Sequence, residues 1–201
     1  MQKTRFTLNG TGMLLMHSDA GVDDRSEISR QIKALTDKKK KDRTDEDQEL
    51  HDRLYWERAM YFDPKIGPFI PAWNVKAMIQ KAAGLRRKGK TVERGLILAT
   101  EAFPLTYTGP RKLDTMWKAK RFADYRSIKN AGPSAGRVMR VRPRFENWSL
   151  ECEFFIDPTE IDERDLIDYT EYAGNFIGLG DYRKRYGKFA VTQNGKKEQA
   201  A

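Results

Sequence analysis

The sequence predicts an α+β fold in which helices cover one face of an antiparallel sheet. Segments of alternating apolar and polar residues, the pattern of strands, recur along the 201 residues. Segments with apolar residues at helical spacing lie between them. Two further stretches are dominated by charged residues, and we interpret them as insertions into this core.

Four segments are expected to be strands: residues 5–15, 96–108, 145–156 and 188–192. The third alternates most clearly, because Leu150, Cys152 and Phe154 can share one face while polar residues occupy the other. Pro104 places the second strand at an edge or a bend, since proline donates no hydrogen bond to a neighbouring strand.

Two helices belong to the same core, at residues 72–84 and 158–175. In the second, Asp157 is expected to cap the helix, Pro158 suits its first turn, and Glu160 completes a D-x-x-E capping box. Its apolar stripe comprises Ile161, Leu166, Tyr169, Ala173 and Phe176. The order strand, helix, strand, strand, helix, strand is that of the ferredoxin-like and RRM-like folds.

The chain is therefore predicted to be a single domain over residues 1–194. An insertion at 25–62 carries two charged helices divided at 38–44, and a second insertion at 109–144 forms a basic finger or thumb. The tail at 195–201 is expected to be disordered.

The composition points to a polyanionic partner. Lysine and arginine exceed aspartate and glutamate by 38 to 29, which gives a formal net charge of +9 and a pI near 9.6. The single cysteine, Cys152, allows no internal disulfide and no cysteine-based zinc site. The sequence contains neither a signal peptide nor an apolar run of membrane length, so we expect a cytoplasmic protein. We also expect no cofactor and no bound metal.

The main candidate site is the basic stretch from residue 118 to 144, whose only acid is Asp124. Its cations are Lys118, Lys120, Arg121, Arg126, Lys129, Arg137, Arg140, Arg142 and Arg144. Guanidinium groups bind phosphates in pairs of hydrogen bonds, and aromatic rings stack on unpaired bases, for which Trp117, Phe122 and Tyr125 are candidates. Gly132, Pro133 and Gly136 indicate a flexible loop or finger. A solvated charged surface is the alternative.

A glycine-rich loop near the C-terminus is the second candidate. Its glycines, Gly178, Gly180 and Gly187, permit close backbone approach, and Arg183, Lys184 and Arg185 are positioned to hold phosphates. A plain turn between a helix and an edge strand is an equally good interpretation.

Residues 84–91, GLRRKGKT, match the Walker A pattern. A working P-loop requires a strand before it and a helix after it, whereas a helix is predicted before this segment and a strand after it. We therefore expect no ATPase and assign Arg86, Arg87, Lys88 and Lys90 as additional phosphate contacts.

An acidic loop follows the first strand. His17 and Asp19, with Asp23 and Asp24, are weak candidates for magnesium binding or general base catalysis. Acidic loop residues are more often simple turn formers, so no catalytic residue is assigned.

Three segments resemble the CRISPR RAMP superfamily, and in particular the repeating backbone subunit of CRISPR effector complexes. They are IGPFIPAWNVKAMIQKAA, GLGDYRKRYGKF and the first strand ending in LLMHSD. The chain also looks like phage proteins of this type. The resemblance implies an RRM-like palm with a finger or thumb at 109–144, and copies that assemble head-to-tail along single-stranded RNA or DNA.

The leading hypothesis is thus a non-enzymatic protein that coats single-stranded nucleic acid as a helical oligomer, by phosphate contacts that read no sequence. One alternative is a metal-dependent endoribonuclease on the same fold, using His17 or Asp19. The other is a structural protein whose basic finger binds an acidic protein partner.

Overall fold

The computed structural model describes residues 1–129, 136–183 and 185–193, without the side chains of Lys40 and Lys129. The predicted tail at 195–201 lies outside these residues. The chain divides into two compact units. The first contains Met1–Leu14, Phe62–Thr108 and the described residues from Phe145 on, and the second contains Leu15–Tyr61 and the described part of 109–144.

An antiparallel sheet forms the frame of the first unit. Its strands are β1 (Gln2–Gly10), β3 (Phe62–Asp63), β4 (Gly67–Pro71), β5 (Leu96–Leu98), β6 (Ala102–Thr106), β9 (Ser149–Ile156) and β10 (Phe189–Gln193). Their order is β10-β1-β9-β6-β4-β3, and β5 also pairs with β9. The predicted α+β class with a mostly antiparallel sheet is confirmed.

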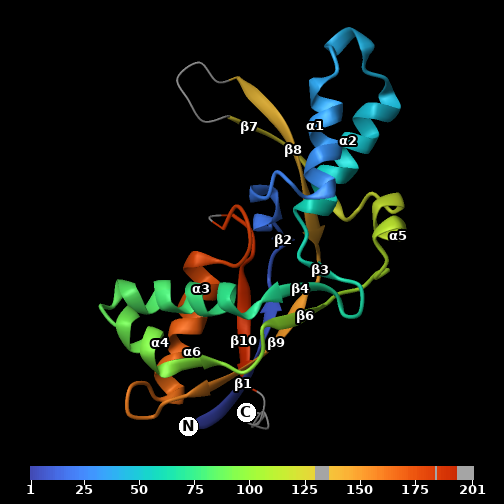
Figure 1. Cartoon of the computed structure of the whole chain (residues 1–201). Helices are drawn as coiled ribbons and strands as arrows, with labels where there is room; N and C mark the ends of the chain where they lie inside the picture. The colour runs from blue at the N-terminus through green and yellow to red at the C-terminus, as the bar shows by residue number, and fades with distance from the viewer. Residues whose placement is uncertain (130–135, 184, 194–201) are drawn as a thin grey trace. The chain divides into compact units, whose positions relative to one another are not determined.

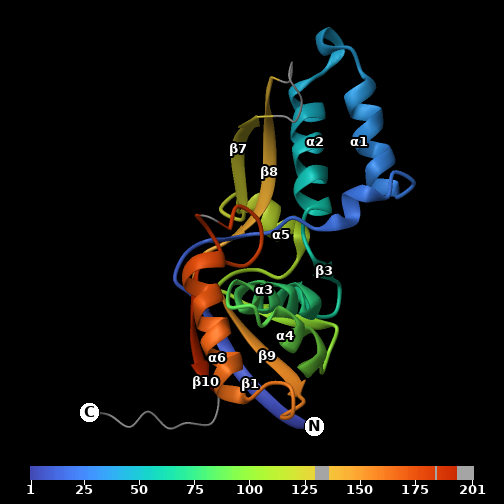
Figure 2. The ribbon, with the colours of Figure 1, turned by 90° about the vertical axis from the view of Figure 1, so that its left-hand side faces the viewer.

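Helices cover one face of this sheet. Figure 2 shows α3 (Ala72–Leu85) and α6 (Glu163–Tyr172) in front of β1 and β9, with the short α4 (Gly89–Gly95) beside α3. Burial along β1 alternates accordingly, because Phe6 and Leu8 are buried while Lys3 and Arg5 are exposed. The core lies between this face and the two long helices.

Several predicted boundaries are wrong. The strand predicted at 5–15 ends at Gly10, and the strand predicted at 145–156 begins at Ser149. The expected helix start at Pro158 is a turn, because the Asp157 carboxylate accepts hydrogen bonds from the backbone and hydroxyl of Thr159 instead of capping a helix. The helix begins after Asp162, whose side chain accepts from the Asp165 backbone at 2.7 Å. The predicted strand at 96–108 is divided into β5 and β6.

The second unit combines a helical pair with a hairpin (Figure 1). Its elements are α1 (Glu27–Asp37), α2 (Asp45–Arg58), α5 (Leu113–Lys118), β7 (Ala123–Lys129) and β8 (Arg137–Phe145), whose last residue belongs to the first unit. β2 (Leu14–Leu15), β8 and β7 form a sheet in that order. The helical pair matches the prediction, with Ser26 and Thr44 as the N-caps.

A small apolar cluster of Ile32, Leu35 and Leu54 holds α1 and α2 together. The two stretches predicted as separate insertions into one domain thus fall within one unit. Among the residues the structure describes, no helix is long and apolar enough to cross a membrane.

Candidate nucleic-acid interface

The basic stretch at 118–144 forms mostly regular structure. After the last residue of α5, its described residues form the antiparallel hairpin of β7 and β8, with Ala123 opposite Pro143 and Lys129 opposite Arg137. Of the two predicted alternatives, a flexible loop or a finger, the two strands do not form a flexible loop. Gly132 and Pro133 lie outside the described residues. Because antiparallel partners share a face, the register decides which cations lie together.

On one face of the hairpin, arginines contact other residues of the protein itself. Arg126 donates two hydrogen bonds to Asp124, at 2.9 and 3.0 Å, so its charge is balanced by the one acid of the segment. Arg142, opposite Asp124, is buried and lies 3.3 Å from the ring Nδ1 of His17. Arg142 is thus a structural residue and was wrongly predicted as a phosphate contact.

Two of the three predicted stacking residues are also structural. Trp117 and Phe122 are buried, and the Trp117 ring lies 5.5 Å from that of Trp56. The Trp56 indole in turn donates to the Phe122 carbonyl at 2.8 Å. These rings form the small core between α2, α5 and the hairpin, which makes them inaccessible to a base. Tyr125, with 47% of its surface exposed, keeps its predicted role as a stacking candidate.

The opposite face of the hairpin is accessible. Arg137 is exposed and donates to the Ser127 hydroxyl and carbonyl, each at 2.9 Å, which fixes its guanidinium on the face that carries Tyr125 and Met139. Both of these large side chains are exposed. Arg140, by contrast, is opposite Arg126 and belongs to the Asp124 face, where it is half-buried with its guanidinium 5.7 Å from the centre of the Tyr55 ring. An ordered cation and two exposed large side chains therefore share one surface.

The remaining predicted cations of this segment differ in availability. Lys118 and Arg121 are exposed, whereas Lys120 is bound to Glu49 at 2.7 Å and Arg144 is half-buried. The Lys129 side chain lies outside the part of the chain that the structure describes.

The glycine-rich loop of the first unit is anchored at both ends. Leu179 donates to the Gly187 carbonyl at 2.9 Å, and Gly187 donates to the Met13 carbonyl at 2.8 Å. Gly178, Gly180 and Gly187 all have positive φ, and a Cβ at Gly187 would lie 1.8 Å from the Leu179 carbonyl oxygen. Arg183 and Arg185 are exposed at the tip, and Lys184 lies outside the described residues.

The loop lies beside aromatic residues that the sequence analysis did not assign to a site. Phe176 was predicted to belong to the buried stripe of its helix, but it is 68% exposed. Phe176, Tyr182 and Lys81 line one pocket with the exposed arginines of the loop. The sequence signal was present, since Tyr182 stands within the basic run DYRKR, but the helical period placed Phe176 in the core.

Residues 84–91 do not form a phosphate-binding loop of the Walker type. The last residues of α3 lead into the segment, Arg87 has a φ of 60°, and α4 begins at Gly89. No strand precedes the loop, so its amides are not positioned at the end of a parallel sheet. The predicted cations Arg86, Arg87, Lys88 and Lys90 are exposed, and Arg86 lies over the rings of Tyr169 and Tyr172.

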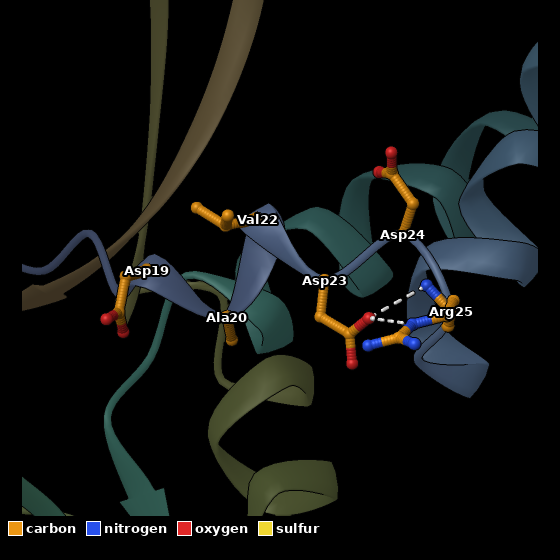
Figure 3. A pocket seen from close by; sticks show the side chains of 6 residues that line it. All are labelled: Asp19, Ala20, Val22, Asp23, Asp24 and Arg25. Atoms are coloured by element: carbon orange, nitrogen blue, oxygen red, sulfur yellow. Dashed lines mark hydrogen bonds and ion pairs between the residues drawn. The ribbon is translucent and has the colours of Figure 1, made fainter.

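The acidic loop forms an open pocket of the second unit around the 3₁₀ turn Asp19–Val22 (Figure 3). The carboxylates of Asp19, Asp23 and Asp24 point in different directions, and Asp23 accepts a hydrogen bond from the Arg25 backbone at 3.0 Å. Within the described residues, no three histidine, cysteine or acidic side chains are grouped to hold a metal ion.

His17 is exposed and contacts Arg142 as described above. Neither it nor Asp19 thus belongs to a recognisable catalytic group. No protein family model matches the chain, and a comparison with curated proteins gives no match either.

Proposed function

We propose that the protein binds single-stranded nucleic acid along its phosphate backbone and performs no chemistry on it. The observation that supports this most directly is the accessible face of the β7–β8 hairpin, where Arg137 is held beside the exposed Tyr125 and Met139. Guanidinium groups bind phosphate oxygens, and exposed aromatic rings stack on bases. The net charge of +9 favours the same class of partner.

A single strand suits this surface better than a duplex. Tyr125 can stack only on a base whose face is free, and the bases of a duplex are already stacked on one another. Phosphate contacts carry no sequence information, so we expect little preference among sequences.

The topology of the first unit supports a ferredoxin-like core as part of this proposal. Taken as one βαββαβ unit, β1, β6, β9 and β10 alternate with α3 and α6, and β1 lies between β10 and β9. The glycine-rich loop lies between α6 and β10, and the proline-rich segment at 64–71 leads into α3. These placements are compatible with a distant relation to the RAMP superfamily, which we retain as a hypothesis.

The hairpin is tested by neutralising Arg137 to glutamine. Each phosphate contact to a single strand contributes about 0.7 to the slope of log affinity against log salt, so this variant should lower that slope by about 0.7. Fluorescence anisotropy with a labelled 20-nucleotide strand measures both affinity and slope.

The matched control is Arg30→Gln, on the exposed surface of α1 in the same unit. It removes one positive charge outside the hairpin and should change binding little. If the Arg137→Gln variant binds as tightly as this control at every salt concentration, this face of the hairpin is not the interface.

A further inference from the structure

A pocket in the first unit combines exposed aromatic rings with cations. It is lined by Lys81 of α3, by Phe176 and Ile177 after α6, and by Tyr182, Arg183 and Arg185 of the glycine-rich loop. Three of these six residues are cations and none is an acid. All of them belong to the first unit, and the pocket shares no residue with the hairpin.

Phe176 is exposed because the helix widens before it. After α6 the chain continues as a π-helical turn, Ala173–Ile177, closed by a hydrogen bond of 2.8 Å from the Gly178 amide to the Ala173 carbonyl. Ala173 is fully buried, and a Cβ at Gly174 would lie 2.2 Å from the Phe189 carbonyl oxygen. With these two residues pressed against the core, Phe176 turns outward, 4.7 Å from the Tyr172 ring.

Tyr182 is held in place by the anchored loop. The backbone amides of Arg185 and Tyr186 donate to its carbonyl at 3.0 Å, and its own amide is bonded to the Asp181 carboxylate. Its φ of 52° is uncommon for a residue with a large side chain. Such backbone strain persists where the surroundings enforce it, and it often marks binding sites. The ring is 42% exposed.

These features match the chemistry of a nucleotide. Aromatic rings offer stacking surfaces to a flat base, and arginine and lysine offer hydrogen bonds and charge to phosphates. An acidic peptide would be attracted by the same cations but has no flat base to pair with two exposed rings. A cationic ligand would be repelled by Lys81, Arg183 and Arg185.

We infer that this pocket is a second nucleic-acid site, in which one unpaired base stacks on Phe176 and Tyr182 while Arg183, Arg185 and Lys81 contact its flanking phosphates. The inference rests on the proposed function, since it assumes that single-stranded nucleic acid is the ligand. It goes further because it adds a base-stacking site on the first unit. An interface made of phosphate contacts alone would have no such site.

Photo-crosslinking tests the site directly. Single strands carrying 5-iodouracil, which couples to aromatic side chains in contact with it, are irradiated with the full-length protein and the crosslinked peptides are sequenced by mass spectrometry. We expect crosslinks at Phe176 or Tyr182. Crosslinks confined to the hairpin, with tight binding, would overturn the inference and leave the proposed function intact.

Affinity measurements with matched variants give the second readout. Stacking contributes about 1–3 kcal/mol per base, so Phe176→Ala and Tyr182→Ala should each weaken binding roughly 5- to 150-fold. Trp73→Ala removes an equally exposed ring (59%) from α3 of the same unit and should have no such effect. Equal affinity of all three variants would contradict the inference, whereas a wild-type protein that binds no strand would contradict the proposed function as well.

Discussion

At the scale of single residues, Asp124 divides the hairpin arginines into two groups. Its carboxylate accepts hydrogen bonds from Arg126 on one face, while Arg137 on the other face donates to Ser127. The sequence shows a nearly acid-free stretch and therefore predicts uniform availability, but a single buried acid changes which cations a ligand can reach. Composition alone cannot reveal this, because the pairing requires that Asp124 and Arg126 lie on the same face of one strand.

Replacing Asp124 by asparagine should lower the free energy of unfolding by about 1–3 kcal/mol, because Arg126 loses two charged hydrogen bonds at a mostly buried site. Urea denaturation measures the change. Asp114→Asn is the control, since it breaks an exposed ion pair with Arg53 that should contribute at most about 1 kcal/mol. Equal losses in the two variants would show that the Asp124 pair has no special structural role.

At the scale of elements, the apolar periodicity of the sequence located most of the helices and strands that bury one apolar face. The helices α1, α2 and α3 and the strand β10 lie close to the segments predicted for them, whereas β1 ends at Gly10 instead of residue 15 and β9 begins at Ser149 instead of residue 145. The hairpin was missed because its many cations were interpreted as a charged loop, although Met139, Val141, Pro143 and Phe145 alternate with arginines along β8. Phe176 was misassigned because a π-helical turn breaks the helical period within the same segment.

The π-helical turn itself is testable through Gly174. Gly174→Ala places a Cβ against the Phe189 carbonyl and ring, and such overpacking should destabilise the protein by about 1–3 kcal/mol. Gly84→Ala in α3 is the matched control, because a Cβ there meets nothing within 4 Å and alanine favours a helix. Thermal unfolding compares the two variants. A Gly174→Ala protein as stable as the control would contradict the close packing of this turn.

At the scale of the whole molecule, positive surface is present on both units. The second unit carries the hairpin face, and the first carries the pocket cations together with Arg86, Arg87 and Lys90. The exposed surface of α6 is acidic by contrast, with Asp162, Glu163, Asp165 and Asp168. Opposite charges on different parts of one chain favour association between copies, as head-to-tail coating of a strand requires.

The number of bound copies should therefore grow with strand length. Light scattering coupled to size-exclusion chromatography measures the mass of complexes formed on strands of 10, 20, 40 and 80 nucleotides. Repeated binding along the strand predicts a stepwise increase in protein mass with length. One copy per strand at every length would contradict coating, although it would not affect the interface on a single chain.

The most direct test of the central claim is anisotropy binding of single-stranded RNA, single-stranded DNA and duplex DNA across a salt series, followed by a denaturing gel. We predict tight binding to single strands, weaker binding to the duplex, a steep loss of affinity with salt, and intact strands. Binding that is absent at low salt, or unchanged by salt, would contradict the phosphate interface. Shortened strands would show that the protein cleaves its ligand.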